Sequence, residues 1–81
     1  MDLQEVTNRI LDVLGGEEFL FVVEADEKLP KLELSPEDQT LFFSSLCEEF
    51  EADLNRKVFD ALMRSRDMDI TDLASQILDE T

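Results

Sequence analysis

The hydrophobic residues of the first segment recur at the spacing of one helix face. They are Leu3, Val6, Ile10, Val13 and Leu14. This periodicity predicts an amphipathic helix over residues 2–14. Asp2 is suited to cap its amino end, with Glu5 three residues on, as in a capping box. Gly15 and Gly16 are the only glycines of the chain and follow directly. We expect one of them to adopt the left-handed conformation that commonly ends a helix.

The helical period is lost between residues 17 and 34. Residues 19–23 form a short apolar run rich in Phe and Val, which is typical of a strand, but the sequence offers no second strand to pair with it. A polar stretch follows, and then three leucines spaced around Pro30. We therefore expect an ordered loop held by apolar anchors, unusually long for so small a chain.

Three more helices are predicted after this loop. The first opens at Ser35, a favourable N-cap, with Pro36 at the first helical position. The next runs from about Asn55 to Ser65, and the last begins after Asp69, which is suited to cap it. In the first of these helices, the residues expected to face the core are Phe42, Phe43, Leu46 and Phe50. In the next they are Leu54, Val58, Ala61 and Leu62, with Phe59 and Met63 along one edge. In the last they are Ile70, Leu73 and Ile77. The fold class predicted is an all-α four-helix bundle, a single domain over residues 1–81 with a long loop between its first two helices.

Charge and residue types narrow the possible functions. The 81 residues include 21 acidic and 7 basic residues, for a formal net charge of −14, with no histidine and one cysteine. Without histidine, neither a Ser-His-Asp triad nor an imidazole metal site can form. A single cysteine excludes an internal disulfide framework and favours a cytoplasmic location. The negative charge argues against nucleic-acid binding, and no apolar stretch is long enough for a membrane span. The expected partners are proteins with basic patches.

Two acidic clusters are candidate sites for a divalent cation. One comprises Asp12, Glu17 and Glu18, and the other comprises Glu48, Glu49, Glu51 and Asp53. Carboxylate oxygens suit Ca²⁺ or Mg²⁺, but neither cluster has the spacing of a dedicated binding loop. We interpret both as solvated surface and expect no metal site. Nothing in the pattern would bury a carboxyl group for acid–base catalysis, so an enzyme is not predicted.

Four short motifs resemble the acyl carrier protein family. Residues 10–15 (ILDVLG) look like the end of the family's first helix. Residues 23–34 (VEADEKLPKLEL) fall on the loop that in the family reads roughly I-T-P-D-T-x-L-x-E-L-G-L. Residues 46–50 (LCEEF) match its L-E-E-E-F-like end of the second helix, and residues 70–73 (ITDL) match its V-x-D-L opening of the last helix. The spacing is free of gaps over residues 23–50, and the resemblance implies a small acidic bundle of four helices.

The same resemblance shows where this chain departs from the family. Members carry Asp-Ser-Leu at the start of the second helix, and the serine holds a phosphopantetheine arm whose thiol bears the acyl chain. Here the three positions read Ser35-Pro36-Glu37. Since proline has no hydroxyl, the resemblance implies that the attachment site is lost and that no cofactor is expected. Ser35 lies one position early, and we interpret it as a helix cap, with phosphopantetheine attachment at Ser35 as the less favoured alternative. Cys47 is interpreted as a packing residue rather than an acyl-bearing thiol.

The resemblance also implies a partner-binding face. Family members dock onto basic patches of synthases and transferases through acidic and apolar residues of the second helix. The candidate partner-binding residues here are Glu37, Asp38, Leu41, Ser44 and Glu48. Leu41 stands where an acid is usual, and Ser44 where an exposed apolar residue is usual. Leu41 lies off the predicted core stripe, and three interpretations of this position remain open. Leu41 belongs to a changed partner surface, it contacts residues 19–23, or it is a single exposed leucine without functional consequence.

Three hypotheses for the function remain open. The preferred one is an acyl-carrier-protein-like module that has lost the prosthetic group and docks to a partner, for which the resemblance implies a fatty-acid or polyketide enzyme. The second is a working acyl carrier that uses Ser35. The third belongs to a different class and is an acidic helical adaptor or inhibitor, unrelated to acyl chemistry, that covers a basic surface.

Overall fold

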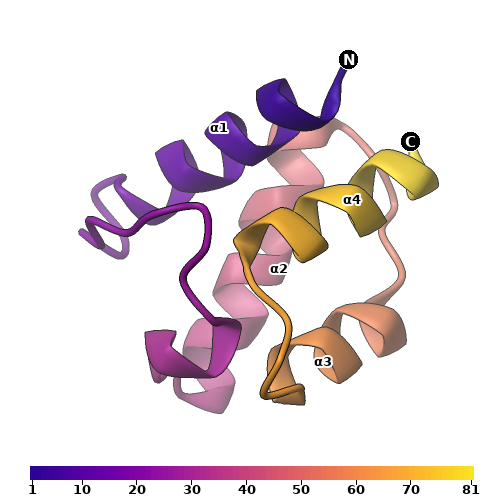
Figure 1. The fold of residues 1–81 in the computed structure, drawn as a ribbon. Coiled ribbons are helices and arrows are strands. Elements are labelled where there is room, and N and C mark those ends of the chain that lie inside the picture. Colours follow the sequence, from indigo (N-terminus) through magenta and orange to yellow (C-terminus); the bar gives the residue numbers. More distant parts are fainter.

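The computed structural model describes residues 1–81 and contains four α-helices, one 3₁₀ helix and no β-strand. In chain order the elements are α1 (Leu3–Leu14), the 3₁₀ helix η1 (Leu29–Leu32), α2 (Pro36–Phe50), α3 (Arg56–Arg64) and α4 (Ile70–Glu80). Figure 1 shows α1 and α4 side by side, with α2 behind them. The expectation of four helices in an all-α arrangement, with a long loop between the first two, is confirmed. None of the helices combines the length and the apolar character that crossing a membrane would require.

The helix starts follow the capping residues predicted from the sequence. The Asp2 carboxylate accepts a hydrogen bond from the Glu5 backbone N–H at 2.8 Å, although the reciprocal bond of a capping box is absent at this end. Asn55, which was expected at the start of α3 but not as its cap, caps this helix in the same way. At α4 both halves of a capping box form between Asp69 and Asp72. A cap is a contact between near neighbours, so its position can be predicted from local sequence alone.

The prediction that a glycine ends α1 in the left-handed conformation is wrong. Neither glycine has a positive φ, and Gly15 lies at φ −81°. The Gly15 N–H still donates to the Leu11 carbonyl at 2.8 Å, and the chain then returns so that the Phe21 N–H donates to the Leu14 carbonyl at 2.8 Å. A Cβ on Gly15 would lie 3.6 Å from the Phe21 carbonyl oxygen and 3.3 Å from that of Leu11. The distance to Phe21 is that of ordinary van der Waals contact, and the tighter contact is with the last turn of α1, so neither an unusual φ nor the returning chain requires glycine here.

One core is formed by all four helices and η1. Its fifteen buried side chains are Val6, Ile10, Leu14, Leu29, Leu32, Phe42, Leu46, Phe50, Leu54, Phe59, Met63, Ile70, Leu73, Ala74 and Ile77. The predicted core faces of α1, α2 and α4 agree with this set except at Leu3, which is exposed, while Val13 and Phe43 are half-buried at its margin.

The predicted core face of α3 is correct only in part. Leu54 is buried and Leu62 packs against the core, as expected. Phe59 and Met63, expected at one edge, are buried, whereas Ala61, expected inside, is exposed. The Phe59 ring packs 5.7 Å from the Phe42 ring and 5.2 Å from the Phe43 ring. The largest apolar side chains therefore determine which face of this short helix is turned inward.

The long loop is ordered and held by apolar anchors, as expected. Phe19 packs edge-to-face on Phe42 at 5.8 Å, and Leu29 is buried. The 3₁₀ helix η1 was not predicted from the sequence. Its Leu29 and Leu32, three residues apart, share one face because a 3₁₀ helix has three residues per turn. Backbone hydrogen bonds from Leu29 to Met68 and from Thr71 to Ala25 tie this part of the loop to the start of α4.

Candidate functional site

The candidate site begins at the start of α2. The Ser35 hydroxyl oxygen accepts a hydrogen bond from the Asp38 N–H at 3.1 Å, and the Ser35 carbonyl accepts from the Gln39 N–H at 2.8 Å. Pro36 occupies the first helical position, where its missing N–H costs no helical hydrogen bond. The predicted capping role of Ser35 is confirmed.

Four of the five candidate partner-binding residues share one face of α2. Glu37, Leu41, Ser44 and Glu48 are separated by four, three and four residues, a spacing that aligns them along a single stripe. All four are exposed, and Leu41 is 40% exposed. Leu46 is fully buried and lies about half a helical circumference from this stripe, at roughly 100° per residue. We call these four residues the α2 stripe; it faces away from the core, and Asp38 is exposed beside it.

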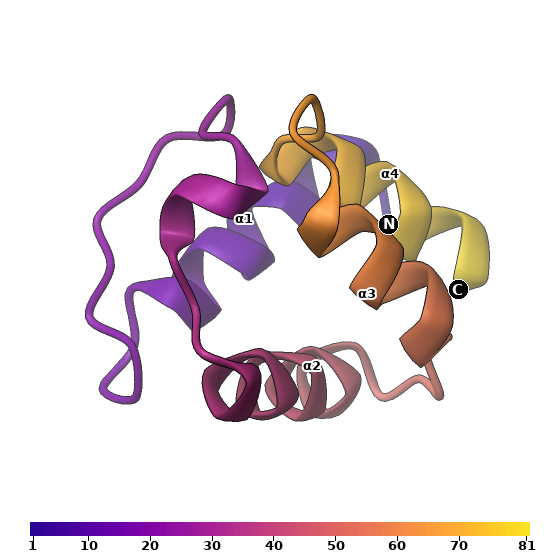
Figure 2. The ribbon, with the colours of Figure 1, turned by 90° about the horizontal axis from the view of Figure 1, so that it is seen from below.

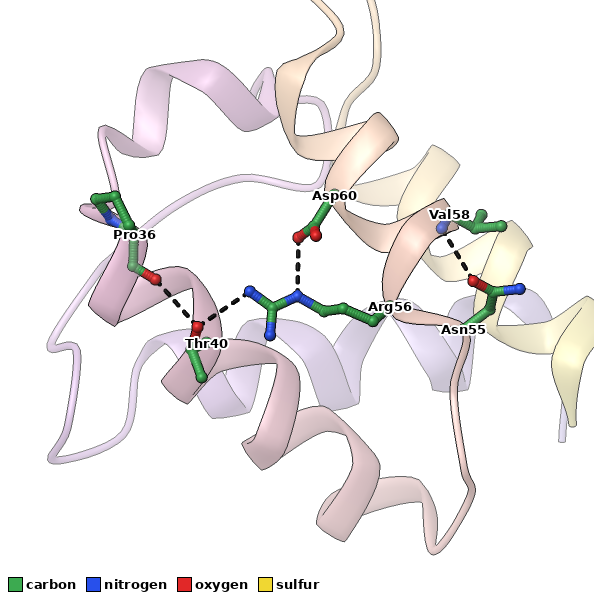
Figure 3. Close-up of polar contacts among 6 residues, drawn as sticks. All are labelled: Pro36, Thr40, Asn55, Arg56, Val58 and Asp60. Atoms are coloured by element: carbon green, nitrogen blue, oxygen red, sulfur yellow. Dashed lines mark hydrogen bonds and ion pairs between the residues drawn. The ribbon is translucent and has the colours of Figure 1, made fainter.

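The first turns of α2 are held against α3 by one arginine that the sequence analysis did not select. Figure 3 shows that the Thr40 hydroxyl donates to the Pro36 carbonyl at 3.2 Å and accepts from the Arg56 guanidinium at 3.0 Å. The Arg56 Nε donates to Asp60 at 2.9 Å, and the guanidinium lies over the Phe43 ring, 5.3 Å from its centroid. The spacing of Arg56 and Asp60, four residues apart in a helix, is the signal from which this pair could have been predicted.

The carboxylates of the α2 stripe have no cation partner within the chain. The two ion pairs of the molecule are Arg9 with Glu49 and Arg56 with Asp60. Because Arg56 is engaged by Asp60, it does not neutralise the acids at the start of α2. Glu37, Asp38 and Glu48 therefore present uncompensated negative charge to solvent.

An acidic hollow lies beside the stripe, where the end of α1 meets the C-terminal part of α2. It has a volume of about 430 Å³ and is lined by Asp12, Val13, Gly16, Glu17, Glu18, Ser45, Glu48 and Glu49. The Ser45 hydroxyl donates to the Glu18 carboxylate at 3.2 Å. The structure thus joins one predicted acidic cluster to half of the other, leaving Glu51 and Asp53 outside. No three carboxylate or thiol groups converge closely enough to hold a metal ion.

Cys47, the only cysteine, does not belong to the exposed face. Its side chain is half-buried and packs against the core. This position agrees with its interpretation as a packing residue.

Comparison of the chain with protein-family models, with curated proteins and with solved structures found no match. The resemblance to acyl carrier proteins therefore depends on the four sequence motifs alone, and Ser35-Pro36-Glu37 at the start of α2 is the departure from it.

Proposed function

We propose that this chain is an acyl-carrier-protein-like module that no longer carries phosphopantetheine and acts by docking α2 onto a basic surface of a partner protein. The observation that carries the proposal is the α2 stripe. It is exposed, turned away from the core, and bears carboxylates without a cation partner in the chain. The resemblance supplies the class of partner, an enzyme of fatty-acid or polyketide synthesis.

The physical properties of the stripe suit reversible docking. Uncompensated carboxylates attract a basic patch, speed association and orient the two proteins. Leu41, between Glu37 and Ser44, offers an apolar side chain at the centre of the contact. Because Arg56 ties the first turns of α2 to α3, the helix is ordered before binding, which lowers the entropic cost of association.

The start of α2 supports the loss of the prosthetic group. Pro36 has no hydroxyl to modify, and the Ser35 oxygen is engaged as the helix cap. After co-expression with a phosphopantetheinyl transferase of broad specificity, we expect the intact mass of the wild-type protein to be unchanged. An addition of about 340 Da, the size of the phosphopantetheine group, that is lost in Ser35→Asn would restore the carrier hypothesis. Asn is the appropriate replacement because it keeps the cap while removing the hydroxyl.

A gain-of-function variant tests the resemblance itself. The triple change Ser35→Asp, Pro36→Ser and Glu37→Leu restores the Asp-Ser-Leu of the family, and Asp is also a good N-cap. If the chain descends from a working carrier, the variant should gain about 340 Da in the same co-expression. No gain of mass in a variant whose circular dichroism shows an intact fold would favour the adaptor or inhibitor hypothesis instead.

Docking is tested with a purified condensing enzyme of fatty-acid synthesis as the probe. We expect Glu37→Lys with Glu48→Lys to weaken binding about tenfold or more, because both changes place a cation against the basic patch. The matched control, Asp67→Lys with Asp79→Lys, makes the same change of net charge at exposed positions outside α2. Equal losses in the two double variants would mean that only the net charge matters, and the proposed role of the stripe would be rejected.

A further inference from the structure

Residues 21–24 alternate between half-buried and exposed positions as in a β-strand, although they belong to no sheet. They follow a turn that ends at Leu20, whose φ of 58° is left-handed. Phe19, Phe21 and Val23 pack against the core, while the residues between them are turned to solvent. Leu20 is 74% exposed and Val22 is fully exposed, at 102%. Such strict alternation is typical of a strand with one face on a hydrophobic core. Val22 is therefore the large apolar side chain on the exposed face of this segment, and exposed Leu20 lies at the turn just before it.

The backbone of this segment is also unpaired on one side. The Phe21 N–H donates to Leu14, but no backbone carbonyl of the chain accepts from the N–H groups of Val22, Val23 or Glu24. In an extended chain the N–H and C=O of one residue point to the edge opposite those of its neighbour. The polar groups of Val22 thus point away from α1. Figure 2 shows this stretch along the left margin of the molecule, with no other backbone on its outer side.

The charges around the segment determine what can pair with it. Residues 10–27 include no lysine or arginine, and the apolar run is flanked by Glu17 and Glu18 on one side and by Glu24 and Asp26 on the other. A second copy of this chain would bring like charges opposite one another, which destabilises strand pairing. A strand carrying lysine or arginine would instead be attracted.

We propose that residues 21–24 are an edge onto which a basic, extended segment of another protein adds as a β-strand. Its backbone hydrogen-bonds to the outer polar groups of Val22, its apolar side chains cover Leu20 and Val22, and its basic side chains face the flanking carboxylates. Main-chain hydrogen bonds supply affinity in this mode of recognition, and alternate side chains supply specificity. This edge is separate from the α2 stripe and does not depend on the proposed function.

The test uses a synthetic peptide of alternating lysine and valine, with acetylated and amidated ends, titrated into the ¹⁵N-labelled protein. We expect saturable chemical-shift changes centred on the amides of residues 21–24, and slower hydrogen exchange of the Val22 N–H. A peptide of the same sequence with N-methyl groups on alternate residues keeps the charge but blocks one hydrogen-bonding edge. It should bind about tenfold more weakly or worse.

Two variants locate the contact. Val22→Pro removes the outer N–H at an exposed position where that N–H has no acceptor within the chain, and should reduce binding as strongly as N-methylation of the peptide. Val22→Thr keeps the backbone and should retain most of the affinity. Thermal unfolding establishes that both variants are folded.

Three results would overturn the proposal. The first is equal affinity for the methylated and unmethylated peptides, and the second is a set of shifts centred on Glu37, Leu41 and Glu48, because both would show binding by charge alone. The third is a concentration-dependent dimer, seen by sedimentation and lost in Val22→Pro, which would assign the edge to a second copy of this chain.

Discussion

Glu51 ends α2 in a conformation that favours glycine. Its φ is 49°, in the left-handed region, where a side chain costs about 1–2 kcal/mol. Its carboxylate also lies at the negative end of the helix dipole, and no basic residue is present in the last turn. We expect Glu51→Gly to raise the free energy of unfolding by about 1 kcal/mol. Urea denaturation followed by circular dichroism at 222 nm measures this change.

The matched control is Ser44→Gly, which places glycine at an exposed position in the middle of α2. There it should lower the free energy of unfolding by roughly 0.5–1 kcal/mol, because glycine loses more backbone entropy on folding. Changes of the same sign in both variants would show that the conformation of Glu51 does not govern its contribution.

The left-handed residues also show what a local sequence pattern cannot predict. They are Leu20, Glu33 and Glu51, none of which is a typical residue for this region, whereas both glycines have negative φ. The conformation that ends a helix depends on where the following chain must go. That path is determined by packing of residues distant in sequence, such as Phe19 on Phe42.

At the level of whole elements, α3 has the ambiguity of a short helix. Its nine residues include apolar side chains at positions 58, 59, 61, 62 and 63, which together cover more than half of its circumference at roughly 100° per residue. Periodicity alone therefore does not select the buried face. The apolar residues of α1 and α4 form narrower stripes, so the core faces of these two helices were predictable from the sequence. In α2 the apolar residues spread more widely, from exposed Leu41 to half-buried Cys47. The candidate residues of the α2 stripe came from the resemblance, and periodicity added only that Leu41 lies off the core stripe of Phe42 and Leu46.

Substitution at Phe59 distinguishes the observed face of α3 from the one expected from the sequence. Phe59 is buried between the rings of Phe42 and Phe43, so Phe59→Ala should lower the free energy of unfolding by about 3–5 kcal/mol. Ala61→Ser, at an exposed position, should change it by less than about 0.5 kcal/mol. Urea denaturation of the two variants provides the measurement. A larger loss for Ala61→Ser than for Phe59→Ala would mean that α3 turns its other face inward.

At the scale of the whole molecule, the acidic hollow results from packing between distant segments. Glu18 and Ser45, which are hydrogen-bonded across it, lie 27 residues apart in the sequence. The two acidic clusters were recognisable in the sequence. Their meeting at one place was not, because it depends on how the end of α1 packs against α2.

The net charge of −14 makes stability depend on ionic strength. Only two ion pairs offset the repulsion among 21 acidic residues, and five of those acids line one hollow. Salt screens repulsion between exposed charges over about 10 Å at 0.1 M. Raising sodium chloride from about 10 mM to 0.5 M should therefore raise the melting temperature by roughly 5 °C, measured by circular dichroism.

In Asp12→Asn with Glu17→Gln, which removes two charges from the hollow, the melting temperature at low salt should be higher and the rise with salt smaller. A salt response unchanged in this variant would place the dominant repulsion outside the hollow, among acids such as those of the α2 stripe.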